Sequence, residues 1–268
     1  MWQLKDILSL VSDTHGNVRT RLQNIKMNMH IEEPEKYGVI ILGDAGINYR
    51  FDEAEAIWKK RINAMGFIIY CVRGNHEERP ENIPTMAAWY DEDVSGIVLR
   101  EPKYPNIRYL KDGEVYTFGA YTAFILGGAY SVDKYYRLET GKCWFPNEQL
   151  TSFEMQNIES YLPTIKCDFV FSHTCPISWQ PRDLFLSIVD QSKVDNTMEM
   201  WFEKIKNKFS WKIWLFGHYH DDRLVRPKVE MFFNDYEFLD EIVARWNEPE
   251  GPPWWMRKDP NYYYSAEA

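Results

Sequence analysis

Five of the six histidines in this chain lie in short polar motifs that recur along the sequence, and only His30 lies outside them. The motifs are, in chain order, Ser12-Asp13-Thr14-His15-Gly16, Gly43-Asp44, Gly74-Asn75-His76-Glu77, Ser172-His173 and Gly217-His218-Tyr219-His220. Imidazole, carboxylate and amide oxygen are the ligands that divalent cations of intermediate hardness take in proteins. This concentration of histidines predicts a metal centre.

Each motif by itself has an ordinary structural explanation. An aspartate after a strand often caps the next helix, and Gly43-Asp44 is also a normal turn. His173 and His218 are compatible with buried histidines whose ring nitrogens are satisfied by neighbours. The combination is more specific, because every motif follows an apolar run, and four glycines among them would let the backbone pass close to a bound group.

Apolar runs that predict strands precede the first three motifs, and segments with helical character follow two of them. We expect strands at residues 7–11, 39–42 and 67–72, and helices at 18–29 and 51–65. Successive strand–loop–helix units favour a largely parallel sheet, whose carboxyl-terminal strand ends are the usual place for a ligand. The polar motifs stand at these ends.

The later part of the chain predicts a mixed series of elements. They are a hairpin of residues 107–110 and 114–118 around an Asp112-Gly113 turn, a strand at 121–126, a helix at 147–161, a strand at 168–171, a helix at 196–207, a strand at 213–216 and closing strands within 223–233. We expect one domain over residues 1–240 and a C-terminal tail over 241–268, whose last part is rich in proline and tyrosine and has no periodicity.

The composition bounds the kinds of partner. The 268 residues carry a net charge of −9, which does not indicate a nucleic-acid binder, since no basic surface would collect backbone phosphates. A phosphate substrate is compatible with this charge, because two divalent cations would dominate the local field. The sequence says nothing about the oligomeric state.

Cysteine usage and hydropathy indicate a cytoplasmic chain without a membrane span. The four cysteines, Cys71, Cys143, Cys167 and Cys175, have no regular spacing, which is typical of reduced thiols. Cys175 follows His173 by two residues, so a thiolate ligand or nucleophile is one interpretation, but packing behind the site is favoured. The N-terminal apolar run is too short for a signal sequence, and no stretch reaches the length of a bilayer.

Taken together, the motifs from Asp13 to His220 resemble the ordered signature of the calcineurin-like metallophosphoesterase superfamily, in the style of its uncharacterised bacterial and phage members. The resemblance implies an α/β fold, a four-layer α/β/β/α sandwich with two central mixed β-sheets. It also implies a dinuclear metal site at the carboxyl-terminal ends of the strands, which would hold two divalent ions among Mn, Fe, Zn, Co and Ni.

The resemblance also implies a role for each motif residue. Asp13, His15 and His220 would bind the first metal, and Asn75, His173 and His218 the second, with Asp44 bridging both. His76 would not bind metal. It would act as the general acid that protonates the leaving oxygen while a metal-bridging hydroxide attacks phosphorus.

One departure from the family pattern concerns arginine. In the protein serine/threonine phosphatase branch the second motif continues with Asp-Arg-Gly, whereas here Gly43-Asp44 is followed by Ala45-Gly46-Ile47-Asn48. Arg50 and Arg73 are candidates to replace the missing phosphate-binding arginine, although a solvated arginine is the favoured interpretation. The segment from Gly127 to Arg137 also resembles one in uncharacterised members. Its Tyr130, Lys134 and Arg137 either line the mouth of the site or belong to a surface loop.

We therefore expect a metal-dependent phosphoesterase that acts on a phosphate-ester substrate. Without an evident arginine pair near the motifs, the sequence slightly favours a broad or diester activity over a strict monoesterase. Within the same class, a protein serine/threonine phosphatase-like enzyme is the competing hypothesis. Outside it, the sequence is compatible with a mononuclear or structural metal site and with a non-catalytic scaffold of the same fold, although a scaffold typically loses ligands and none is lost here.

Overall fold

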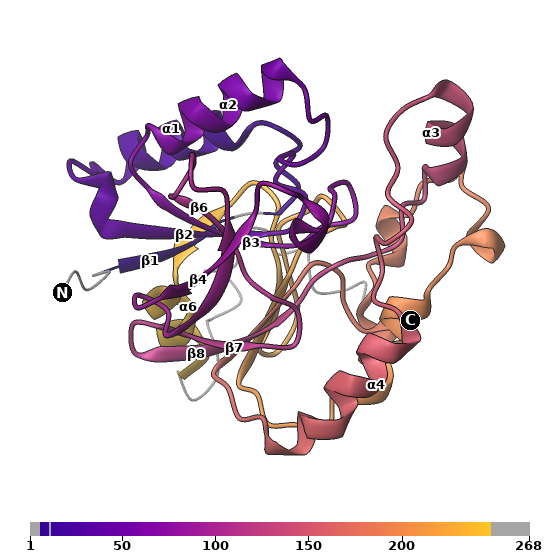
Figure 1. Ribbon diagram of the computed structural model, residues 1–268. Coiled ribbons are helices and arrows are strands. Elements are labelled where there is room, and N and C mark those ends of the chain that lie inside the picture. Colours follow the sequence, from indigo (N-terminus) through magenta and orange to yellow (C-terminus); the bar gives the residue numbers. More distant parts are fainter. Residues whose placement is uncertain (1–5, 11, 248–268) are drawn as a thin grey trace.

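Two mixed β-sheets, A and B, form the centre of the computed structural model, which describes residues 6–10 and 12–247 (Figure 1). Sheet A has the strand order β13-β1-β2-β3-β6-β5-β4. Its strands are β1 (Asp6–Leu10), β2 (Tyr37–Leu42), β3 (Ile68–Val72), β4 (Ala87–Asp91), β5 (Gly96–Arg100), β6 (Ile107–Tyr109) and β13 (Tyr236–Phe238). The four strands β1, β2, β3 and β6 are parallel, and β13, β5 and β4 add antiparallel edges.

Sheet B has the order β11-β12-β10-β9-β8-β7. Its strands are β7 (Val115–Phe118), β8 (Tyr121–Leu126), β9 (Phe169–Ser172), β10 (Ile213–Phe216), β11 (Arg223–Arg226) and β12 (Val229–Met231). Strands β8, β9, β10 and β12 are parallel neighbours, while β7 and β11 pair in the antiparallel sense. The chain thus has the mixed α/β fold with two mixed sheets that the sequence predicts.

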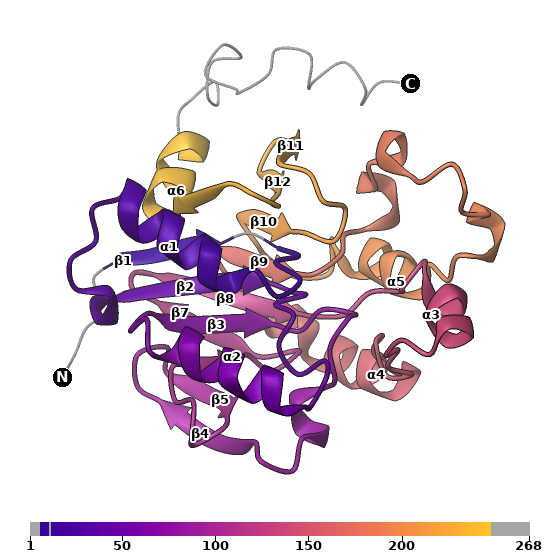
Figure 2. The same cartoon turned by 90° about the horizontal axis from the view of Figure 1, so that it is seen from above.

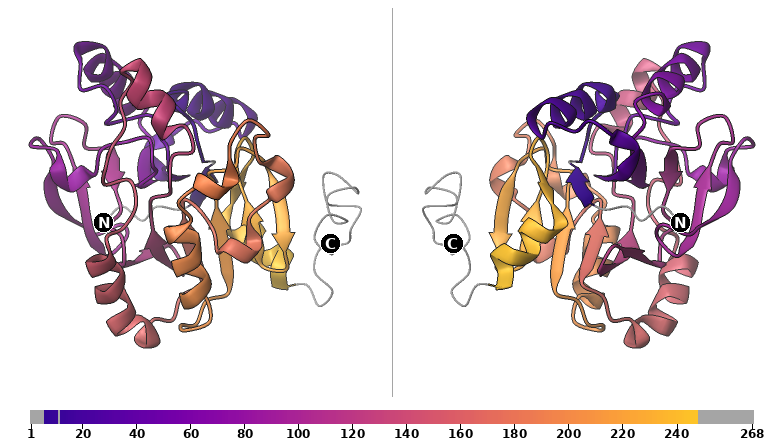
Figure 3. Two further views of the ribbon diagram at one scale, coloured as in Figure 1. Left: turned by 90° about the vertical axis from the view of Figure 1, so that its right-hand side faces the viewer. Right: turned by 90° about the vertical axis from the view of Figure 1, so that its left-hand side faces the viewer.

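Six α-helices accompany the sheets in the described part of the chain. They are α1 (Val18–Asn28), α2 (Glu53–Asn63), α3 (Lys134–Thr140), α4 (Ser152–Tyr161), α5 (Thr197–Ile205) and α6 (Leu239–Asn247). The apolar side chains of α6 pack into the same core as residues of both sheets. Helices α1 and α2 run along sheet A in both views of the ribbon (Figures 1 and 2). Helix α6, in yellow, lies near the end of the described chain, beside β13 and β1 (Figure 3).

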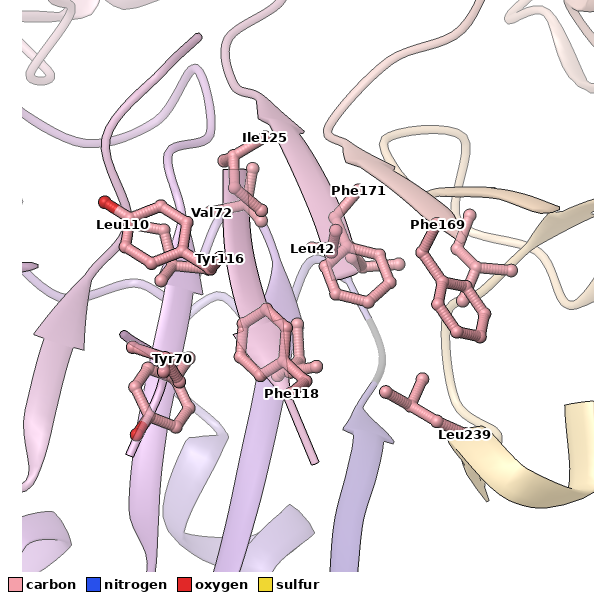
Figure 4. Packing of buried hydrophobic residues seen from close by; sticks show 14 of the residues in the cluster. Leu42, Tyr70, Val72, Leu110, Tyr116, Phe118, Ile125, Phe169, Phe171 and Leu239 are labelled. Carbon is pink, nitrogen blue, oxygen red and sulfur yellow. The ribbon is translucent and has the colours of Figure 1, made fainter. Parts of the chain in front are cut away.

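Alternation along the central strands creates two apolar layers around sheet A. On β2, Ile40 and Leu42 belong to the core between the sheets, whereas Val39 and Ile41 belong to the core under α1 and α2. Successive side chains of a strand point to opposite faces, so a strand buried on both faces is apolar throughout. Figure 4 shows the first of these cores, where Leu42 lies near Phe171 of sheet B.

A third apolar cluster joins sheet B to its helices. Phe124 and Trp214 of sheet B pack there with Met155 of α4 and Phe202 of α5. Burial of side chains of this size contributes about 2 to 3 kcal/mol each, so the cluster holds α4 and α5 firmly on the sheet. Strands β9 and β10, which lead directly to His173 and His218, are fixed by this packing.

Side-chain caps fix where two predicted helices begin. The helix expected at 51–65 begins at Glu53, because the carboxylate of Asp52 accepts a hydrogen bond from Glu55 N at 2.8 Å. The helix expected at 147–161 begins later, at Ser152, because Thr151 and Glu154 form a capping box. Both boundaries follow from local sequence.

The predicted hairpin around Asp112-Gly113 is wrong. Strand β6, which precedes the turn, pairs with β3 in sheet A, whereas β7, which follows it, pairs with β8 in sheet B. The two segments are therefore in different sheets, and the Asp-Gly turn carries the chain between them. A turn signal marks a change of direction, but the partner of each strand is chosen by long-range packing.

The structure also contains elements that the sequence did not predict, namely the β4–β5 hairpin, helix α3, strand β13 and helix α6. Helix α6 spans the domain boundary expected at residue 240, and residues 248–268 of the expected tail lie outside the described residues. Among the described residues, every helix is too short or too polar to span a membrane.

Candidate metal centre

The loops after five parallel strands bring the polar motifs together. The loops after β1, β2 and β3 carry Asp13, Asp44 and Asn75, and those after β9 and β10 carry His173 and His218. Backbone contacts connect them: Asp13 N donates to Gly43 O at 3.0 Å, and His218 N donates to Asp13 Oδ2 at 2.7 Å. Residues more than 200 positions apart thus share one site.

Asp13, His15 and His220 form a first group of convergent ligand atoms, which lie within 4.8 Å of one another. The Nε2 atoms of His15 and His220 are 3.2 Å apart, and His220 Nε2 is 3.2 Å from Asp13 Oδ1. Asp13 Oδ1 is buried, yet it has no hydrogen-bond partner in the part of the chain that the structure describes. A cation among these atoms would satisfy all three.

Asp13, His173 and His218 form a second group within the same distance. Asn75 extends it, because its Oδ1 lies 2.8 Å from His173 Nε2. Asp44 Oδ1 lies 3.7 Å from the same ring nitrogen. Asp13 belongs to both groups, whereas Asp44 lies beside the second one, so the bridging role expected for Asp44 stays a prediction.

The hydrogen bond of one ring nitrogen indicates which atom of His173 faces the centre. Its Nδ1 lies 2.8 Å from the carbonyl of Leu42, which can only accept, so Nδ1 carries the proton. In the neutral form of the ring, the lone pair of Nε2 would face Asn75 Oδ1 and Asp44 Oδ1. Three acceptor atoms in this arrangement would need positive charge between them, either a metal ion or the proton of a charged His173 ring.

The charges of the side chains in the centre also indicate that positive charge is needed there. Burial by itself lowers the pKa of His173, but the charges of Asp44 and Asp13 raise it to about 9. Burial, reinforced by the charge of His173, lowers the pKa of His218 to about 3, so this ring is neutral and able to bind metal. The two buried carboxylates therefore demand positive charge at this point.

The backbone of the centre is strained. Asp13, His15, Asp44, His218 and His220 have positive φ values of 59°, 41°, 49°, 71° and 57°. Left-handed conformations of residues other than glycine are uncommon and concentrate at functional sites. The loops are also tightly packed, because a Cβ atom on Gly74 would lie 2.0 Å from Asp44 Oδ1.

His76 lies at the edge of the centre and belongs to neither ligand group. Its Nε2 is 3.9 Å from Asp44 Oδ2, and its ring centroid is 5.5 Å from that of His15. Arg137 Nη2 is 3.5 Å from His76 Nε2. Burial lowers the pKa of His76, the charge of Asp44 opposes this effect, and the charge of Arg137 adds to it.

A chain of hydrogen bonds that the sequence did not reveal orients Asn75. Its Nδ2 donates to Ser131 Oγ at 2.9 Å, and Ser131 Oγ donates to Glu148 Oε2 at 2.5 Å. Trp144 Nε1 donates to the same carboxylate oxygen at 3.0 Å. Because Nδ2 is bound in this way, Oδ1 of Asn75 is turned toward His173. Ser131 lies in the segment from Gly127 to Arg137, which resembles one in uncharacterised family members. This resemblance was the sequence feature that could have pointed to Ser131.

The other residues expected near the mouth are dispersed. Lys134 Nζ lies 4.2 Å from the centroid of the Trp144 ring, and Tyr130 is largely buried. Arg73 is buried and pairs with Asp112 at 3.0 Å. Of the arginines that the sequence singled out, Arg137 is thus the one that the structure brings beside His76.

Two further candidates from the sequence, Arg50 and Cys175, lie in surroundings that do not indicate a role in the centre. Arg50 is exposed and pairs with Asp52 at 3.0 Å. Cys175 is buried in the core under sheet B, and burial raises the pKa of its thiol well above the usual value. The thiol form fits the packing interpretation of Cys175 better than a thiolate ligand or nucleophile.

Comparison with known proteins identifies a family and a similar solved structure. A family model described as calcineurin-like phosphoesterase matches residues 9–222, which contain all the motif residues. No curated protein matches the chain. A solved crystal structure superposes with a TM-score of 0.48 at 12% identity, over 88% of this chain and 94% of the other.

Proposed function

The chain belongs to the calcineurin-like phosphoesterase family, whose members hydrolyse phosphate esters with divalent metals, and we propose that it does so with two metal ions held between its sheets. The observation that carries this proposal is the buried Oδ1 of Asp13, which accepts no hydrogen bond from the described residues and lies where the two ligand groups meet. The four-layer α/β/β/α order and a cytoplasmic location belong to the same proposal.

The donor set fits such ions. In the proposed arrangement Asp13, His15 and His220 hold one cation, and Asn75, His173 and His218 hold the other, with Asp44 between them. Two cations in this place would polarise the phosphoryl oxygens and activate water for attack on phosphorus. The mixture of nitrogen and oxygen ligands suits Mn, Fe, Zn, Co or Ni.

His76 then has the role of proton donor. It contacts Asp44 at 3.9 Å, lies outside both ligand groups and is partly open to solvent. A group so placed can reach the oxygen of a leaving alcohol. Burial lowers the pKa of His76, and the charge of Asp44 opposes this effect. Proton transfer from His76 Nε2 would neutralise the alkoxide as the P–O bond breaks.

The competing hypotheses have less support. An enzyme like the protein serine/threonine phosphatases would need the arginine of the second motif, and the residues that follow Gly43-Asp44, from Ala45 to Asn48, contain none. A non-catalytic scaffold would have no need for seven converging candidate ligands, five of which have left-handed backbone.

The decisive experiment measures bound metal and hydrolysis in the same preparation. We expect about two metal equivalents per chain after loading, by inductively coupled plasma mass spectrometry, and metal-dependent release of 4-nitrophenol from an aryl monoester or diester. Asp44→Ala should lose both properties, because the buried carboxylate holds the two ion sites together.

The matched control is Asp190→Ala, which removes an exposed carboxylate paired with Lys193. It should keep both metals and full activity. No bound metal in the wild type after loading would overturn the proposal, and an Asp44→Ala protein that still held two metals would exclude the bridging role.

A further inference from the structure

Arg137 is the described arginine whose guanidinium reaches the proposed centre. Helix α3, which carries it, has no buried residue, and the helix lies at the edge of the molecule in two views (Figures 1 and 2). The side chain of Arg137 nevertheless has only 13% of its surface exposed. It therefore turns back from its exposed helix toward His76.

Three partners fix the orientation of this guanidinium. Its Nε donates to Asp133 Oδ2 at 2.7 Å, and its Nη1 donates to the hydroxyl of Tyr49 at 2.8 Å and to the carbonyl of Cys143 at 3.3 Å. The plane of an arginine side chain is rigid, so these contacts determine where Nη2 points. Nη2 lies 3.5 Å from His76 Nε2 and has no oxygen acceptor among the described residues.

His76 Nε2 and Arg137 Nη2 thus stand side by side, next to a place proposed to hold cations. Nη2 carries two N–H groups, so one remains for a further acceptor even where the other donates to His76, and an anion bound at the cations would be such an acceptor. Among the other arginines near the motifs, Arg73 is engaged with Asp112 and with the carbonyl of Glu148, and Arg79 with Glu154. Neither leaves a comparable donor at the centre.

The position of this donor bears on the type of ester. A monoester dianion has three non-bridging oxygens, and two metal ions leave one of them to be bound by the protein. In a diester the corresponding oxygen carries a second organic group and is a poor acceptor. A site built to donate a hydrogen bond discriminates against an analogue that cannot accept it.

We propose that Arg137 binds a non-bridging oxygen of the terminal phosphate and makes this chain a phosphomonoesterase. The assignment rests on the proposed function and replaces the slight preference for diesters that followed from the apparent lack of a suitable arginine in the sequence. Asp133 neutralises part of the charge of Arg137. Arg137 therefore contributes to phosphate binding mainly through the fixed position of one N–H group.

The first test compares two esters with the same leaving group on the metal-loaded protein. In Arg137→Gln, kcat/KM for 4-nitrophenyl phosphate should fall by about ten- to a hundredfold, the scale of a hydrogen bond to a charged group. For bis(4-nitrophenyl) phosphate it should change by less than about threefold. Arg137→Lys, which keeps the charge but loses the planar fork, should fall between wild type and Arg137→Gln for the monoester.

The matched control is Arg50→Gln, which removes an exposed arginine close to Tyr49 and should leave both rates unchanged. Equal losses for the two esters, or no loss for the monoester, would overturn the assignment. Thermal unfolding of each variant is measured with the rates, because Arg137 also donates to Asp133 and Tyr49. The contrast between the two esters separates loss of phosphate binding from loss of these structural contacts.

The second test uses binding and does not depend on turnover. By isothermal titration calorimetry of the metal-loaded protein, inorganic phosphate should bind Arg137→Gln about tenfold more weakly than wild type. Dimethyl phosphate should bind both proteins equally. Equal phosphate affinities would contradict a role for Arg137. A wild type that hydrolyses neither ester, yet binds phosphate through Arg137, would overturn the proposed function and the monoesterase assignment and leave only the phosphate contact of Arg137 standing.

Discussion

The carboxylates of Asp13 and Asp44 decide what the centre can bind. Both are buried next to histidine rings, and two buried negative charges need positive charge nearby. A protonated His173 would supply one charge, but in that state its Nε2 could not be a ligand. Divalent cations remove this conflict, because they match the carboxylates and leave the rings neutral.

His76→Asn tests the assignment of the proton donor. The variant should keep both metals and slow hydrolysis by about two to four powers of ten, the scale of general acid catalysis. The loss should be larger for phenyl phosphate than for 4-nitrophenyl phosphate, since a poorer leaving group depends more on protonation. Steady-state rates for the two esters and metal analysis provide the measurements.

A matched histidine is available for comparison. His30 is exposed, lies outside the motifs and, like several ligands, has a left-handed backbone with φ of 51°. His30→Asn should have wild-type rates and metal content. Loss of metal from His76→Asn would show that His76 is a ligand, and equal losses for the two esters would argue against proton transfer.

At the scale of elements, one connection supports two parts of the centre. The segment between β8 and α4 contains Ser131, which holds Asn75, and Arg137, which reaches His76. Glu148, near its end, accepts from Ser131 and closes the network. Helix α3 is thus placed by polar contacts and not by an apolar face.

Helix α5 carries a carboxylate that predicts a pH-dependent stability. Glu199 is buried, its Oε1 accepts from Thr174 Oγ1 at 2.7 Å, and its Oε2 has no partner among the described residues. Burial raises the pKa of Glu199 to about 7 from 4.5, against the effect of the Thr174 hydrogen bond. The folded state therefore holds the proton more tightly, and this stabilisation is complete below about pH 4.5 and lost as pH rises through about 7.

Glu199→Gln should remove this dependence. Relative to wild type, its free energy of unfolding in urea should rise by about 2 to 3 kcal/mol between pH 5 and pH 8. The measurement is best made with chelator present, so that ligand protonation does not contribute through bound metal. Glu203→Gln, on the exposed side of the same helix, should show no such gain. A difference between Glu199→Gln and wild type that did not vary with pH would contradict the buried, protonated state.

At the scale of the whole molecule, the centre joins the two sheets. Its candidate ligands come from loops of sheet A between Asp13 and Asn75 and from loops of sheet B between His173 and His220. The apolar core between the sheets holds these loops in register, as Figure 4 shows for Leu42 and Phe171. Ions bound here would connect the two halves of the chain.

Removal of metal should therefore lower the thermal stability. Metal at a hundred times its dissociation constant stabilises the folded state by about 2.7 kcal/mol, which corresponds to about 5 to 10 °C in Tm for a chain of this size. Scanning calorimetry with chelator and with added metal measures the difference. Asp13→Asn, which removes one buried charge shared by both groups, should show a much smaller response. Equal Tm values for wild type in the two conditions would contradict a metal that connects the sheets.

The sequence predicted most of the elements that carry the site. Strands β1, β2, β3, β9 and β10 lie within a few residues of their predicted bounds, because each is an apolar run that ends at a polar motif. The β4–β5 hairpin was not predicted, since Trp89, Tyr90 and Ile97 are exposed there and the alternation of a half-buried strand is lost. Helix α3 was missed for a related reason, as it has no apolar face.

By itself, the sequence determined which residues could bind metal, because ligand type and position after a strand are local properties. The tertiary structure decided three things that depend on contacts between distant segments. It placed β6 and β7 in different sheets, it made Asp13 common to both ligand groups, and it brought Arg137 beside His76 across 61 positions. Local patterns set strand and turn, but the packing of two sheets selects which side chains meet.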